Sequence, residues 1–269
     1  MSRLYRMLLA GAVCAGVAAC SEQLDVINPN NPESARALTR PTDVEALISG
    51  SYNTMHRATV GATNLTPQTY VLGMESYSSL ANEQMGVRAS IPRPPIVNYR
   101  GNPVASQNYS PYLGLARAAR AAAIGLSKVN NPTFTFFPPS ANQTARAKAF
   151  AHFVTGVSLG QMAMVYDSGS AVNENDDLTI SAPLALLGYD SLAAYALRKL
   201  DSAATISPAS GALGYPGSWF SASSTALTNA QFVGLVRGWQ ARIRAGVARD
   251  PAERAAVNWP LVITHAAAF

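Results

Sequence analysis

The sequence has 269 residues, of which 48% are hydrophobic and 13% are charged. This length and apolar content suffice to bury a core in one large domain or two modest ones, and they exclude a chain that is disordered throughout. The formal net charge of +5 reflects 20 Lys and Arg residues against 15 Asp and Glu residues. Because the basic residues are spread along the chain without a Lys/Arg block, the sequence does not favour nucleic acid as a partner.

The N-terminus has the pattern of an export signal. Arg3 and Arg6 provide its positive charge, and the apolar stretch 7–17 is too short to span a bilayer as a helix. The Val-Ala-Ala-Cys motif that ends at Cys20 resembles the bacterial lipobox, in which the signal is cut before the cysteine and its thiol is lipidated. We therefore expect a lipoprotein signal peptide over residues 1–19 and a lipid anchor at Cys20, whose acyl chains each add about 0.8 kcal/mol per buried CH₂. An ordinary secretory signal is the alternative.

The cysteine count has a simple consequence once the signal is removed. Cys14 leaves with the signal and Cys20 is acylated, so no disulfide, thiol catalyst or cysteine metal site is expected. Ser21 and Glu22 follow the anchor, and neither is the aspartate associated with inner-membrane retention. An outer-membrane location, attached to the membrane through the lipid, is therefore favoured.

A polar tether is expected over residues 20–41, because prolines and asparagines at 28–32 favour turns and extended chain. The first predicted helix begins at Thr42, which together with Glu45 has the spacing of a capping box. Apolar residues then recur at helical spacing: Val44, Leu47, Ile48, Tyr52 and Met55.

Similar start signals recur later in the chain. Gln143 and Gln231 each lie three residues after a Ser or Thr, which predicts helices over about 140–166 and 228–249. A further helix is expected to begin at Asp250, which is followed by a proline and a glutamate in the first turn.

Two more segments have the helical period without the capping box. One helix is expected from Ser110-Pro111 to Asn130, and the other from Tyr189 to Ser207. The best strand candidate is 133–137, and 68–80 is compatible with a short helix. The pattern predicts an all-α fold of tetratricopeptide-like helix pairs without a regular repeat. The apolar face of the helix expected from Ser110-Pro111 to Asn130 contains Leu115, Ala119, Ala122, Leu126 and Val129.

Long irregular stretches are expected at 86–109, 167–183 and 207–224, and loops of this length are often functional. Their aromatic residues have polar neighbours, which suits sugar rings with apolar faces and hydroxyl edges. These aromatic residues are Tyr99, Tyr109, Trp219 and Phe220. The alternative is that an aromatic side chain anchors its loop onto the helices. We favour this alternative for Trp219 and Phe220.

The segment 156–160 matches the G-x-S-x-G nucleophile motif at Ser158, and Asp201 or Asp250 with His265 would complete a triad. That motif requires a strand before the serine and a sharp turn at it. Here one helical period continues through the segment, so small residues at a helix contact are the favoured interpretation. A lipid-anchored serine hydrolase is retained as an alternative function.

Neither a metal nor a cofactor is predicted. One loop contains four acidic residues that could offer oxygen ligands to calcium: Asp167, Glu174, Asp176 and Asp177. Their spacing is not that of an EF-hand, so a solvated acidic loop is the favoured interpretation. The sequence has no P-loop and no G-x-G-x-x-G motif. Its histidines are isolated and have no metal-site spacing: His56, His152 and His265.

The lipobox and several later segments together resemble the opening of SusD/RagB-family outer-membrane lipoproteins. The resemblance begins at Leu24-Asp25-Val26 and Asn28-Pro29-Asn30, and it covers essentially all of the chain after the signal. Its further motifs are 42–52, 161–167, 197–201, 218–220 and 241–242.

The resemblance implies an all-helical scaffold whose irregular loops form a ligand surface. Such proteins cap a SusC-like TonB-dependent transporter at the cell surface and capture glycans, or in some members peptides, without catalysing a reaction. Ligand residues vary across the family, so the loop 86–112 is only the first place to look. The ligand candidates are Tyr99, Arg100, Asn102, Asn108 and Tyr109.

Family members are considerably longer, and this chain stops at 266–269 within an apparently continuing helix. Residues 42–269 are therefore expected to form a SusD-like helical domain that is incomplete at its C-terminus. A structural lipoprotein that binds no ligand is a further alternative.

Overall fold

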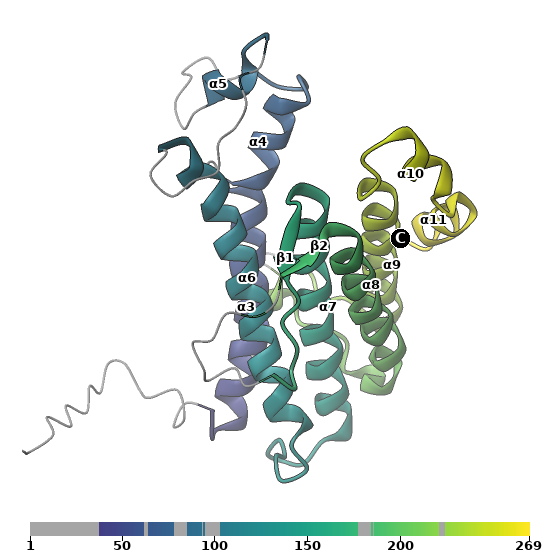
Figure 1. Cartoon of the computed structure of the whole chain (residues 1–269). Coiled ribbons are helices and arrows are strands. Elements are labelled where there is room, and N and C mark those ends of the chain that lie inside the picture. Colours follow the sequence, from purple (N-terminus) through teal and green to yellow (C-terminus); the bar gives the residue numbers. More distant parts are fainter. Residues whose placement is uncertain are drawn as a thin grey trace, which may run out of the picture. The chain divides into compact units, whose positions relative to one another are not determined.

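Figure 1 shows the computed structural model, which describes residues 38–61, 64–77, 85–92, 94, 103–176, 184, 186–220 and 224–269. Helices contain 72% of these residues and strands 4%, which confirms the predicted all-α fold. The predicted signal peptide, the anchor Cys20 and nearly all of the tether lie outside the described residues.

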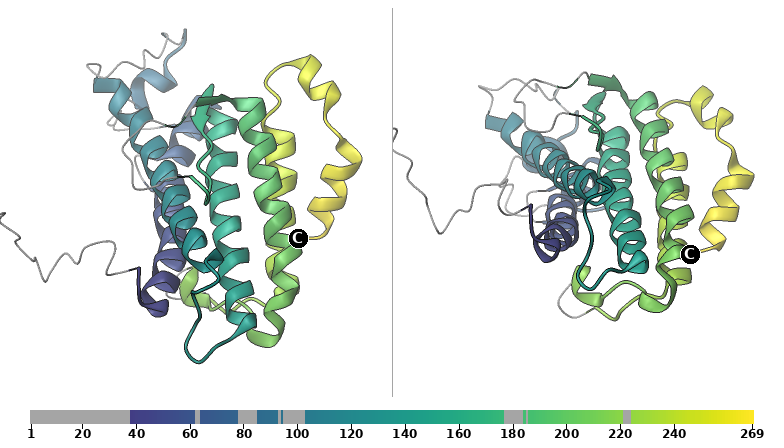
Figure 2. Two further views of the ribbon diagram at one scale, coloured as in Figure 1. Left: turned by 60° about the horizontal axis from the view of Figure 1, so that its bottom comes forward. Right: turned by 90° about the horizontal axis from the view of Figure 1, so that it is seen from below.

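Long helices lie side by side in chain order, and each contacts the next (Figures 1 and 2). They are α3 (Pro41–Val60), α6 (Pro103–Asn130), α7 (Ala141–Val165), α8 (Tyr189–Ile206) and α9 (Asn229–Gly246).

Shorter elements lie between or beyond them. Within the described residues, β1 pairs antiparallel with β2, with Ser168 opposite Gly188, and α11 packs on α9. These elements are α4 (Leu65–Leu72), α5 (Met85–Ala89), β1 (Ser168–Ser170), β2 (Leu186–Gly188), the 3-10 helices η1 (Ser207–Leu213) and η2 (Gly217–Trp219), α10 (Pro251–Ala256) and α11 (Trp259–Ala267).

The capping signals locate three of the helix starts correctly. The Ser140 hydroxyl accepts a hydrogen bond from the Gln143 backbone N–H at 3.2 Å, and Thr228 forms the complete reciprocal box with Gln231. Asp250 caps α10 through the backbone N–H of Glu253. These predictions succeeded because each cap is formed by residues within one turn of the chain.

The capping box predicted at Thr42 is wrong. Helix α3 begins at Pro41, with Arg40 as its N-cap residue. A proline suits the first helical position, because its ring fixes φ and an N–H there would have no partner in the helix. The Glu45 carboxylate instead accepts a 2.7 Å hydrogen bond from Arg146 of α7.

Other predicted boundaries also need correction. The helix predicted from Ser110 starts seven residues earlier, and the short helix proposed within 68–80 is α4, which ends at Leu72. The strand candidate 133–137 forms turns and irregular chain, and the strands among the described residues are β1, after α7, and β2, before α8.

Helix α7 is the centre of the core. Every residue from Ala149 to Ala163 is buried, and the helix contacts α3, α6, α8 and α9. A helix with apolar or small side chains on every face can pack against neighbouring helices on all sides. The buried stripe on α6 is also confirmed, because the five apolar residues predicted to share that face are at most 3% exposed.

Loop aromatics pack onto this core, as favoured from the sequence. Trp219 lies edge-on to the Phe150 ring, with centroids 4.8 Å apart, and the Arg146 guanidinium lies 4.8 Å from the Trp219 ring. Phe220 contacts both Phe150 and Tyr52. Trp219 and Phe220 therefore anchor their loop and do not form an open aromatic surface.

Glycines in α7 allow neighbouring helices to approach closely. A Cβ added at Gly156 would lie 2.7 Å from Leu200 Cγ and 3.0 Å from the Ala196 carbonyl oxygen of α8. We expect Gly156→Val to lower the free energy of unfolding by about 1–3 kcal/mol through overpacking. Exposed Gly50 of α3 is the control, because a Cβ there meets no atom within 4 Å. Gly50→Ala should add about 0.5–1 kcal/mol. Urea unfolding that ranked the two variants equally would contradict this close contact.

Candidate functional site

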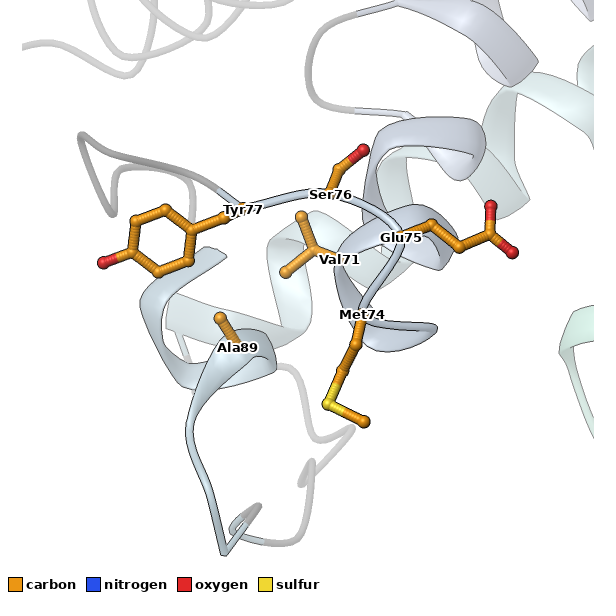
Figure 3. Close-up of a pocket in the computed structure, with 6 residues that line it drawn as sticks. All are labelled: Val71, Met74, Glu75, Ser76, Tyr77 and Ala89. Carbon is orange, nitrogen blue, oxygen red and sulfur yellow. The ribbon is translucent and has the colours of Figure 1, made fainter.

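An open pocket of about 370 Å³ lies where α4 ends, and this volume is within the range of small-molecule sites (Figure 3). Val71 of α4 and Ala89 of α5 form apolar walls, and the other described residues of the lining are four consecutive ones after α4. Tyr77, which lines this pocket, is 81% exposed. The lining residues are Val71, Met74, Glu75, Ser76, Tyr77 and Ala89.

The pocket follows from the way in which α4 ends. The Met74 N–H donates to the Val71 carbonyl at 3.2 Å, and the Glu75 N–H donates to the Tyr70 carbonyl at 2.9 Å. These are the two bonds of a Schellman motif, which places the residue after the C-cap in the left-handed region. That residue is Met74, with φ of 57°, although Gly73 stands immediately before it.

Helix α5 is held in place by a buried cation. Arg88 is only 1% exposed, and its guanidinium donates a 2.8 Å hydrogen bond to the side-chain oxygen of Asn108 on α6. Burial lowers the pKa of Arg88, and the nearby Tyr166 opposes this effect. Because Ala89 is the next residue, this hydrogen bond also fixes one wall of the pocket.

Tyr166, the C-cap residue of α7, hydrogen-bonds α6 close to a proline that interrupts that helix. Pro111 lies inside α6 and has no N–H to donate. The Tyr166 hydroxyl donates to the Asn108 carbonyl at 2.7 Å and also hydrogen-bonds the Tyr112 backbone. The hydroxyl thus lies between the Asn108 carbonyl and the Tyr112 backbone, two residues that are four apart in the helix. Burial raises the pKa of Tyr166, so the phenol keeps its proton and can donate.

The predicted ligand residues are only partly placed by the structure. Tyr99, Arg100 and Asn102 lie outside the described residues. Asn108 and Tyr109 lie on α6 and not in a loop, because the helix continues through Pro111. Asn108 supports the pocket wall through Arg88.

Tyr109 is 60% exposed but does not line the pocket. Sequence reasoning missed the residues that do line it. The available signal was Gly73, which precedes the polar residues Glu75 and Ser76 and marks the end of a helix.

The nucleophile interpretation of Ser158 is not supported by its surroundings. Ser158 lies in the middle of α7, is fully buried, and has neither a preceding strand nor a sharp turn. Its hydroxyl has no hydrogen-bond partner within the described part of the chain. The small residues around it are contact points for α8 and α9, as predicted.

The acidic residues considered for calcium have separate partners. Asp167 pairs with Arg249, Glu174 pairs with Lys199, and Asp176 accepts a 2.8 Å hydrogen bond from the Asn173 backbone. Asp177 lies outside the described residues. No group of three His, Cys, Asp or Glu side chains among the described residues could hold a metal ion.

None of the described helices is both long and apolar enough to span a bilayer.

Comparisons of the chain with protein-family models, curated proteins and solved structures find no match.

Proposed function

We propose that the chain is an outer-membrane lipoprotein, anchored through Cys20 and facing the cell exterior, that binds nutrient oligomers. In this proposal it delivers glycans, or as a second class peptides, to a SusC-like TonB-dependent transporter and catalyses no reaction. The observation that carries the binding role is the open pocket beside the exposed Tyr77 ring.

The pocket chemistry suits a sugar ring. An aromatic face offers a flat apolar surface of low conformational cost, and a sugar presents a complementary face of C–H groups. The apolar walls of Val71 and Ala89 extend this surface, while the Ser76 hydroxyl and the Glu75 carboxylate can bond sugar hydroxyls.

The N-terminal motif and the fold support the same proposal. A lipid on Cys20 would attach the protein to a membrane without a transmembrane helix. The succession of packed helices is the kind of scaffold that the SusD/RagB resemblance implies. A binding role is favoured over a purely structural one because the exposed Tyr77 side chain lines a pocket.

A glycan array probed with the mature protein tests the binding role. We expect binding to at least one oligosaccharide class, and we expect Tyr77→Ala to weaken it about tenfold or more, because most contact energy resides in a few aromatic anchors. Phe137→Ala is the matched control. Phe137 is an aromatic residue that is 92% exposed in the loop after α6, beyond the opposite end of that helix from Asn108.

Phe137→Ala should bind as the wild type does. Absence of binding to every glycan, or equal binding by wild type and Tyr77→Ala, would contradict the proposed site.

A further inference from the structure

We infer that Met74 is a ligand-contacting residue and that its pocket accepts neutral oligosaccharides in preference to acidic ones. This inference rests on the proposed function, because it names the contact and the ligand class of the same site. It is carried by the left-handed backbone of Met74, by the exposure of its side chain and by the charge of the lining.

The backbone of Met74 is strained for no evident structural benefit. Left-handed conformations are unfavourable for residues with a Cβ, and glycine is the usual residue at this position of a Schellman motif. Gly73 lies one position earlier, at φ of −75°, a backbone conformation that residues with a Cβ also adopt. Shifting the glycine by one residue would relieve the strain while keeping the same turn.

The side chain of Met74 does not explain the strain through packing. It is 67% exposed and is not part of the hydrophobic core. It is instead one of the residues that line the pocket (Figure 3). Strained non-glycine residues occur at ligand sites, where the side chain is needed in a position that an unstrained backbone would not provide. A flexible thioether is also well suited to an irregular apolar ligand surface.

The charge of the lining indicates the ligand class. Among the described residues that line the pocket, the charged one is Glu75, an exposed acid. Figure 3 shows Glu75 and Tyr77 on opposite sides of Val71. Because Glu75 is itself part of the lining, a ligand that fills the pocket would meet this carboxylate. Uronic acid residues would be repelled there, whereas neutral sugars could donate hydroxyl hydrogen bonds to it.

Calorimetric titration of the mature protein tests both parts. The neutral probes are cellohexaose, xylohexaose and maltohexaose, and the acidic probe is a galacturonic acid hexamer. We expect at least one neutral probe to bind, and the acidic probe to bind at least fivefold more weakly than the best neutral one. Met74→Ala and Met74→Gly should each weaken that binding about fivefold or more, whereas Met74→Leu should stay within twofold of wild type.

Thermal unfolding separates the strain from the contact. Met74→Gly should raise the unfolding midpoint by roughly 2 °C, because glycine adopts this backbone freely, whereas Met74→Ala keeps the strain and should not. Both variants remove the Met74 side chain, but only Met74→Ala keeps the strained backbone. A binding defect shared by the two variants is therefore due to the lost side-chain contact.

The outcomes distinguish failure of the inference from failure of the proposed function. If wild type binds a neutral probe and Tyr77→Ala weakens it, while Met74→Ala and Met74→Gly bind normally, the Met74 contact is overturned and the site remains. Tighter binding of the acidic probe overturns the ligand class. If wild type binds none of these probes, the inference of a neutral oligosaccharide ligand fails, whereas the proposed ligand site fails only if no glycan on the array is bound either.

Discussion

Glu174→Gln is expected to lower the free energy of unfolding by about 3–5 kcal/mol, because it leaves the ammonium group of Lys199 buried without its counter-charge. The two side chains are only 13% and 10% exposed, and the Lys199 ammonium donates directly to the Glu174 carboxylate. The pair attaches the chain that follows β1 to α8. An ion pair at the surface would give a much smaller effect.

The control removes both charges together. Lys199→Met with Glu174→Leu takes away the cost of burying ions, so the double variant should recover most of the stability that Glu174→Gln loses. Urea unfolding at pH 7 of wild type, Glu174→Gln and the double variant measures this. A Glu174→Gln variant within 1 kcal/mol of wild type would show that the ion pair is solvated.

Acidification is expected to destabilise the protein between about pH 6.5 and pH 4 through His152. His152 is buried on α7, and burial is the main cause that lowers its pKa to about 4. The positive charges of Lys199 and Lys148 lower the pKa further, and the Glu174 carboxylate opposes them. The ordinary histidine pKa is about 6.5, so between these values the unfolded chain binds a proton that the folded chain excludes.

The sign and size of the effect follow from this difference. Stability is full above about pH 6.5 and is lost as the pH falls towards 4, by roughly 3 kcal/mol at about 1.4 kcal/mol per pKa unit. Burial would raise the pKa of Glu174, but hydrogen bonds from Lys199 and the Glu174 backbone, together with the Lys199 charge, hold it below its ordinary value. Protonation of Glu174 therefore removes further stability as the pH falls below the ordinary glutamate pKa.

His152→Leu separates these two contributions. The His152 Nδ1 atom has no hydrogen-bond partner within the described chain, so an apolar side chain of similar size suits the site. The free energy of unfolding, measured in urea at pH 7, 5.5 and 4, should fall with pH in wild type and much less in His152→Leu. Parallel losses in the two proteins would refute the assignment to His152.

The sequence was informative where structure depends on neighbouring residues. Helices α7, α8 and α9 begin within a residue of their predicted starts, because caps and helical periods are local patterns. The apolar stripe on α6 was predicted for the same reason, since residues three and four apart share a helix face.

The candidate site could be predicted only in part, because it depends on distant contacts. Pro111 seemed to mark a helix start, but α6 begins at Pro103 and continues through it, and Tyr166, 55 residues further along the chain, hydrogen-bonds the Asn108 carbonyl of this turn. Asn108 was therefore expected in a ligand loop, whereas its side chain binds Arg88. Nothing local indicated that Met74, and not Gly73, would adopt the left-handed conformation.

The central claim is that the pocket beside Tyr77 binds an oligosaccharide, and ligand-induced chemical shifts test it most directly. The mature protein would be labelled with ¹³C in its methionine methyl groups and tyrosine rings and titrated with the glycan that binds best on the array. Met74→Leu and Tyr77→Phe would assign the two resonances. The account predicts saturable shifts of the Met74 methyl and Tyr77 ring signals, while the buried Met55 and Met162 signals stay in place. Saturable binding that leaves both pocket signals unchanged would contradict it.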